Sequence, residues 1–181
     1  NIDSDMSGFV ALCAVLGKLT EVNLSDCHLG PTSTGELAKV FSDADAVVKK
    51  VVLSQNKLFG ANQYGNHTVD ADQSGWAALC GALPGSPVEE LDVADVGMGA
   101  TGGTSLAKAT SSMAAINEVN VSQNPIGVEG GKALANVIPE CSSLRWIVVG
   151  KAARIPVHNA EVTSIDASGQ DLGPGEVTVL A

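Results

Sequence analysis

One spacing pattern recurs along the chain and restricts its fold more than any other feature. It is clearest from Ile116 to Ile126, where apolar residues occupy the first, fourth, sixth and eleventh positions and Asn124 occupies the ninth. Side chains alternate across a strand, so the fourth and sixth positions share one face. The pattern therefore predicts a short buried strand that turns sharply and leads into a helix.

The intervals between copies of the pattern indicate what each copy contains. A separation of 28 residues divides Val88 from Ile116, and the same separation divides Ile116 from Leu144. A repeat of this length has room for a strand and about three helical turns. The expected strands begin at Leu19, Val48, Val88, Ile116, Leu144 and Val162.

The segments between the strands also repeat, with a glycine followed seven residues later by a leucine. Residues 130–138 place their apolar side chains on one helical stripe, which we expect to face the strands. The glycines suggest a tight strand-to-helix turn with positive φ. The four pairs are Gly30 and Leu37, Gly99 and Leu106, Gly127 and Leu134, and Gly173 and Leu180.

The segment Asn124-Pro-Ile-Gly127, followed by Gly130 and Ala133-Leu134, resembles the ribonuclease-inhibitor-like subfamily of leucine-rich repeats. The resemblance covers nearly the whole chain. It implies an α/β fold, a right-handed solenoid with a concave parallel β-sheet and convex helices, commonly used for protein recognition.

Three copies depart from this pattern at the ninth position. Val96, Ala152 and Gln170 replace the usual Asn or Cys. We therefore expect the side-chain hydrogen bonds between neighbouring copies to be interrupted at these places.

Two copies also have unusual lengths. An insertion at about residues 59–73 should form a projecting loop. The fifth copy is too short for a helix, and residues 151–160 should cross to the sixth strand in an extended path.

Residues 1–16 align without gaps to residues 68–83, which makes them the helical half of a repeat. From this we expect a single leucine-rich-repeat domain over residues 1–181 that is a fragment of a longer protein. Both segments contain Asp-x-Asp-x-Ser-Gly, beginning at Asp3 and Asp70. Calcium loops begin in the same way but need a glutamate at position twelve, so helix capping is the simpler explanation.

Composition narrows the classes of ligand. The net charge is −10 and the pI about 4.5, which opposes nucleic-acid binding and favours a protein partner with a basic or mixed surface. The four cysteines show no metal-ligand spacing, and free buried thiols favour a cytoplasmic location. No apolar run approaches the roughly 18 residues of a membrane span. We expect no metal and no cofactor.

The third, fifth, seventh and eighth positions of the strand motif should point away from the core and form one surface. Glu90, Asp92, Asp95 and Glu118 should make an acidic patch there, and Trp146 with Val148 an apolar patch with a cation, Lys151, at its rim. The candidate protein-binding residues are Glu21, Asn23, Lys50, Val52, Glu90, Asp92, Asp95, Glu118, Asn120, Trp146, Val148 and Lys151.

The leading hypothesis is a protein–protein interaction module that binds through its concave strand face and has no catalytic activity. His67, near Tyr64 in the insertion, has no carboxylate or nucleophile at a diagnostic spacing. Two alternatives are a GTPase-activating protein, because the Ran GTPase-activating protein resembles the same subfamily, and a structural scaffold segment of a larger assembly.

Overall fold

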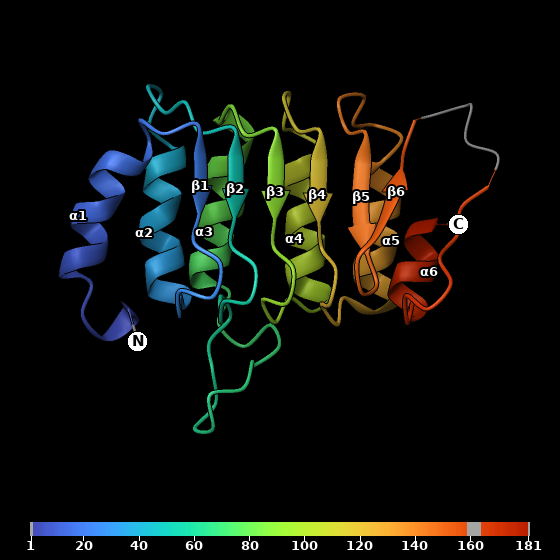
Figure 1. The fold of residues 1–181 in the computed structure, drawn as a ribbon, viewed down its shortest axis with the longest axis horizontal. Helices are drawn as coiled ribbons and strands as arrows, with labels where there is room; N and C mark the ends of the chain where they lie inside the picture. The colour runs from blue at the N-terminus through green and yellow to red at the C-terminus, as the bar shows by residue number, and fades with distance from the viewer. Residues whose placement is uncertain (1, 159–163, 181) are drawn as a thin grey trace.

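The fold is a single sheet of strands covered on one side by a layer of helices (Figure 1). The computed structural model describes residues 2–158 and 164–180. The strands are β1 (Glu21–Asn23), β2 (Lys50–Val52), β3 (Glu90–Asp92), β4 (Glu118–Asn120), β5 (Trp146–Val149) and β6 (Ala153–Pro156). The helices are η1 (Ile2–Ser4), α1 (Ser7–Leu16), α2 (Pro31–Phe41), α3 (Ser74–Ala82), η2 (Leu83–Gly85), α4 (Ala100–Thr110), α5 (Gly127–Val137) and α6 (Pro174–Leu180).

Strands β1 to β5 are parallel and lie in chain order. Each copy contributes its fourth-position residue to one continuous buried row of Val22, Val51, Leu91, Val119 and Ile147. The helices pack against the same side, where Leu37, Leu106 and Leu134 of the repeated glycine–leucine pairs are buried (Figure 1). The structure thus confirms the predicted α/β architecture with a parallel sheet.

The sheet ends differently from the prediction. After β5 the chain reverses at Gly150, where φ is 62°, and β6 pairs antiparallel with β5. Residues 164–167, where the sixth parallel strand was expected to run, form no strand, and the first residues of that expected strand lie outside the described chain. The fifth copy has no helix to carry the chain away, so its short connection folds back as a hairpin.

The helices approach one another closely through glycines. A Cβ atom added to Gly75 on α3 would lie 1.9 Å from the carbonyl oxygen of Pro31 on α2. One added to Gly131 on α5 would lie 2.1 Å from the carbonyl oxygen of Gly175 on α6. Any side chain at either position would therefore force neighbouring helices apart.

Buried amides tie certain neighbouring copies together. The Oδ1 atom of Asn56 accepts hydrogen bonds from the backbone N–H groups of Cys27 and Leu29 in the preceding copy, at 3.0 and 2.9 Å. Asn124 does the same for its own preceding copy. Its Oδ1 atom accepts from Val96 and Met98, both at 3.0 Å.

The expected interruption at Gln170 is wrong. Its Oε1 atom accepts a hydrogen bond from the N–H of Ala152 at 3.0 Å, the equivalent of the bonds made by the buried asparagines. Gln has one more methylene than Asn, and its amide still reaches the preceding copy. Val96 and Ala152 have no polar side-chain atom, so the interruption stands at those two copies.

Aspartates from one copy cap the helix of the next. The carboxylate of Asp70 accepts from the N–H groups of Gly99, Thr101 and Gly102 at the start of α4, at 2.7 to 3.1 Å. Asp3 contacts the start of α2 in the same way. Carboxylates stabilise helix N-termini, whose N–H groups have no partner within the helix.

These caps also correct the reason given for two of the repeated glycines. The φ angles of Gly30 and Gly99 are −123° and −96°, so neither needs the positive φ that was expected. A Cβ at Gly30 would lie 2.4 Å from an oxygen of Asp3, and one at Gly99 would lie 2.6 Å from an oxygen of Asp70. Glycine is needed to leave room for the capping carboxylate.

The insertion at residues 59–73 projects beyond the ends of the neighbouring strands and helices (Figure 1). Its base is anchored, because Phe59 is buried against Trp76 with the ring centroids 5.3 Å apart. The outer part narrows through an antiparallel bridge between Ala61 and His67, and Tyr64 is 78% exposed. The base belongs to the core, while the outer part extends into solvent.

Candidate protein-binding face

The predicted outward residues form two straight rows across the sheet, because the strands pair without register shifts. Parallel strands bring equivalent residues to within about 5 Å of one another. The third-position row is Glu21, Lys50, Glu90, Glu118 and Trp146, and the fifth-position row is Asn23, Val52, Asp92, Asn120 and Val148. We call the side of the sheet that carries these rows the strand face.

The third-position row mixes charges and is not uniformly acidic. The Nζ atom of Lys50 lies 2.7 Å from Oε2 of Glu90. The hydrogen bond to Glu90 raises the pKa of Lys50 above its usual value, and the charges of Glu90, Glu21 and Glu118 act in the same direction. Lys50 is therefore a fixed cation set among carboxylates.

A second cation on this face, Arg154, was not predicted. Its Cζ atom lies 3.7 Å from the centre of the Trp146 ring. Its guanidinium also donates to Oε2 of Glu118, from Nη2 at 2.7 Å and from Nε at 3.0 Å. Arg154 comes from β6, so only the hairpin brings it across the indole. The missing helix of the fifth copy signalled an irregular connection, but it did not indicate that the chain returns as a hairpin.

The predicted apolar patch is correspondingly smaller than expected. Val148 is only 6% exposed, because Arg154 lies directly opposite it in the β5–β6 pair. Trp146 is half-buried rather than open. Lys151 is not the cation at its rim, since it lies in the turn after β5 and pairs with Asp171 at 2.7 Å. Arg154 takes that place.

The polar residues of the fifth-position row also have a structural role. Oδ1 atoms of Asn23, Asp92 and Asn120 each accept a hydrogen bond, at 3.0 Å, from the backbone N–H two residues later. Asp166 makes the same turn to Ser168 at 2.9 Å, and these hydrogen bonds lower the pKa of Asp166. The sixth copy thus keeps this turn, although its described residues 164–167 form no strand.

Asp95 connects the turn after β3 to the insertion. Its Oδ1 atom lies 3.2 Å from Nε2 of His67, and Nζ of Lys57 lies 3.2 Å from the same nitrogen. Burial lowers the pKa of His67, the positive charge of Lys57 lowers it further, and Asp95 only partly opposes them. The imidazole is therefore mainly neutral at neutral pH, which suits a packing contact at the base of the loop.

In the Asp-x-Asp-x-Ser-Gly segments the second aspartate binds the first N–H of the helix that follows, although the N-cap residues themselves are Met6 and Gln73. Oδ1 of Asp5 accepts from the N–H of Ser7 at 3.0 Å, and Oδ1 of Asp72 accepts from the N–H of Ser74 at 2.9 Å. Hydrogen bonds from these serines lower the pKa of both aspartates. No group of three potential metal ligands occurs among residues 2–158 and 164–180.

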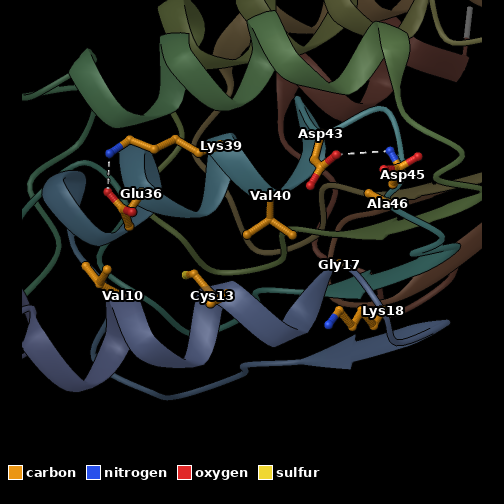
Figure 2. Close-up of a pocket in the computed structure, with 11 residues that line it drawn as sticks. Val10, Cys13, Gly17, Lys18, Glu36, Lys39, Val40, Asp43, Asp45 and Ala46 are labelled. Carbon is orange, nitrogen blue, oxygen red and sulfur yellow. Dashed lines mark hydrogen bonds and ion pairs between the residues drawn. The ribbon is translucent and has the colours of Figure 1, made fainter.

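A hollow of about 420 Å³ separates α1 from α2 (Figure 2). Its lining combines aliphatic side chains with Glu36 and Lys39, which pair with each other. Cys13 also reaches it, but burial raises the pKa of this thiol to about 11. A thiol in its neutral form is a weak nucleophile. Among the helices in the described chain, none has the length and apolar run needed to cross a membrane.

The leucine-rich-repeat family model, described as "Leucine Rich repeat", matches residues 18–33 and 116–135. No curated protein sequence matches the chain. The solved structure of the leiomodin-1 actin-binding site 2 is 14% identical, has a TM-score of 0.63 and covers 79% of both chains. The tropomodulin C-terminal domain of Caenorhabditis elegans is 15% identical, has a TM-score of 0.58 and covers 94% of this chain and 93% of that one.

At such identities the two solved structures establish a shared fold alone. The family match adds two segments that contain β1 and β4, each with its following turn. The fold and these two segments together support the description of this chain as a leucine-rich-repeat protein.

Proposed function

We propose that the chain is a protein-interaction module that binds a protein partner through the strand face, as the concave side of a right-handed solenoid of the ribonuclease-inhibitor-like kind. The observation that supports this most is the in-register row of Glu21, Lys50, Glu90 and Glu118, which ends at Trp146 under Arg154. The row offers charges of both signs and an aromatic ring in fixed positions. Aromatic and arginine side chains are enriched among the residues that dominate binding.

The charges on this row define the surface that the partner needs. On the two rows of the strand face carboxylates outnumber cations. Glu21 in the third-position row and Asp92 in the fifth-position row have no cation within ion-pair distance in the described chain. A partner with lysine or arginine opposite these groups, and an acidic residue opposite Lys50, would be complementary. Such complementarity controls orientation and association rate more than affinity.

The other faces of the described chain support this choice less. Glycines on the helices lie at contacts between neighbouring helices. The side-chain amide of Asn124 is buried and bonded to backbone groups, so it is not available to a partner. The buried thiols Cys13, Cys80 and Cys141 fit a reducing compartment, and we place the protein in the cytoplasm on that ground.

A photo-crosslinking experiment tests the strand face against a matched control. A photoreactive amino acid replaces Val52 on the strand face or Val128 on α5, two valines that both reach the surface. Purified actin is the first probe, because one similar structure is named as an actin-binding site. A native cell extract, with crosslinked proteins identified by mass spectrometry, is the second.

We expect the Val52 variant to crosslink one or a few defined proteins and the Val128 variant to give none of them. Added unlabelled protein should compete with the Val52 crosslink. Crosslinks that arise from Val128 and not from Val52 would place the partner on the helices and contradict the proposal.

A further inference from the structure

A second hollow on the helical side of the molecule repeats the one between α1 and α2. It lies between α3 and α4 and has a volume of about 320 Å³. We call the two cavities the α1–α2 hollow and the α3–α4 hollow. The α3–α4 hollow is lined by Ala77, Cys80, Gly81, Pro84, Ser105, Lys108, Ala109 and Ser112.

The two hollows are equivalent residue by residue. The gap-free alignment of the two helical segments pairs Cys13 with Cys80, and the shared glycine–leucine spacing pairs Lys39 with Lys108. Continued along both helices, these alignments give every lining residue of the α3–α4 hollow a counterpart that lines the α1–α2 hollow. The cavity is therefore a repeated feature of the fold.

Both hollows lie at junctions where an aspartate caps the second helix. Asp3 caps α2 at one junction, and Asp70 caps α4 at the other. The junction between α2 and α3 is closed by contrast, because Gly75 brings the backbones of the two helices together. The capped junctions leave space between their helices that a close glycine contact removes.

The charges around the two hollows differ. Glu36 pairs with Lys39 in the α1–α2 hollow (Figure 2). The counterpart of Glu36 is Ser105, and Lys108 forms no ion pair in the part of the chain that the structure describes. The remaining charged residues of the α1–α2 hollow, with their uncharged counterparts, are Lys18 with Gly85, Asp43 with Ser112, and Asp45 with Ala114. Among the described residues, Lys108 alone brings a charge to the lining of the α3–α4 hollow.

We propose that the α3–α4 hollow binds an acidic segment of a partner protein, with an aliphatic side chain between the two helices and a neighbouring carboxylate paired with Lys108. The base of the hollow is apolar, since Cys80 and Ala109 are buried there. Burial raises the pKa of Cys80 to about 12, so its neutral thiol acts as a small apolar group. Lys108 is exposed, and in a chain of net charge −10 its unpaired ammonium favours an anionic ligand.

The size and the place of the hollow limit what it binds. Ligand sites have volumes of about 300–1,000 Å³, and the α3–α4 hollow lies at the lower end of that range. It suits one side chain with its flanking backbone. The hollow lies among the helices, whereas the strand face lies on the other side of the sheet (Figure 1). Either proposal can therefore fail without the other.

A peptide library with a counter-selection tests this site directly. Random peptides displayed on phage are selected on the intact chain, and those that also bind the Ser105→Glu variant are removed. Ser105→Glu gives Lys108 a carboxylate three residues earlier in α4, as Glu36 does for Lys39 in α2, so we expect the melting temperature to stay unchanged. Peptides that bind the strand face recognise both proteins and are lost at this step. We expect the remaining sequences to carry Asp or Glu beside Leu, Ile or Val.

The affinity of an enriched peptide, measured by fluorescence anisotropy, decides the role of Lys108. Ser105→Glu should weaken binding about fivefold or more, because the new carboxylate occupies Lys108 and repels the ligand. Lys108→Gln should weaken it by a similar factor. Asn136→Glu makes the same change in net charge on α5, away from the hollow, and should leave the affinity unchanged.

NMR spectra of the labelled protein then locate the peptide. We expect the backbone amides of Gly81 and Ala109 to shift on binding, and those of the strand face to stay in place. A selection that enriches no peptide, or only peptides without a carboxylate, would overturn the proposal. So would equal affinity of the original protein and Lys108→Gln, or shifts confined to the strand face.

Discussion

Arg154 controls how much of Trp146 is available on the strand face. The guanidinium lies 3.7 Å from the ring centre and is held there by Glu118. Replacing Arg154 with alanine should uncover the indole. Because the other tryptophan, Trp76, is fully buried, acrylamide quenching of fluorescence should report on Trp146 almost alone.

The expected loss of stability follows from the exposure of the groups involved. The side chains of Arg154 and Glu118 are 49% and 25% exposed, so their ion pair contributes roughly 0.2–1 kcal/mol after solvent screening. A cation over an indole near the surface adds about 0.5–1 kcal/mol. Arg154→Ala should therefore lower the free energy of unfolding in urea by about 1–2 kcal/mol.

Two further variants separate the contributions. Arg154→Lys keeps the charge but lacks the planar group that covers the ring, so it should retain part of the ion pair and still raise the quenching of Trp146. Glu118→Gln removes the anion that positions the guanidinium. A double-mutant cycle of Arg154→Ala with Glu118→Gln should give a coupling of about 0.5–1 kcal/mol. The reasoning fails if Arg154→Ala leaves the quenching of Trp146 at its original level.

Three other predictions concern the core, the insertion and the partner. Asn124→Ala leaves two buried N–H groups without an acceptor and should cost about 2–5 kcal/mol in urea unfolding, while the exposed Asn136→Ala should change little. The pKa of His67 is lower in the folded protein than in the unfolded chain, so the unfolded chain binds a proton more readily as the pH falls. The contribution of His67 to stability is therefore complete above about pH 6.5, the ordinary pKa of histidine, and declines below it. Melting temperatures between pH 7.5 and 5.5 should therefore fall less in His67→Gln than in the original protein. Exchanging the partners of the Lys50–Glu90 pair, as Lys50→Glu with Glu90→Lys, keeps the ion pair and net charge and should leave urea unfolding unchanged. Titration with a strand-face partner should nevertheless show at least about tenfold weaker binding, a change of about 1.4 kcal/mol.

The sequence predicted the strand layer well because each copy solves the same burial problem in the same way. Ile116, Val119 and Val121 are all at most 2% exposed, as their positions in the motif required. The spacing of apolar residues suits a short strand that must turn into a helix. Repetition of that spacing then fixes the register, so the third-position and fifth-position rows followed directly.

The residues that the sequence missed depend on where the chain goes after the pattern stops. Arg154 acts on the strand face only because β6 returns antiparallel, and nothing in the spacing of the fifth copy distinguishes a returning hairpin from a crossing segment. Asp70 was assigned to the start of its own helix, but its acceptors serve the N–H groups of α4. Backbone donors carry no sequence signature, so their partners cannot be identified from residue type.

The contacts between copies alternate, which explains why the strand motif is uniform while the helical segments are of two kinds. Asn56, Asn124 and Gln170 each bind the copy that precedes them, through an amide beneath the turn. Asp3 and Asp70 act at the intervening junctions, where they cap the helix that follows. A capping aspartate requires glycine at the helix start that it contacts, and a close helix pair requires glycine within the helix itself. A strand within the sheet pairs with a neighbouring strand on each side, so its sequence motif is the same from copy to copy. The sequence of each helix differs with the kind of junction on either side of it.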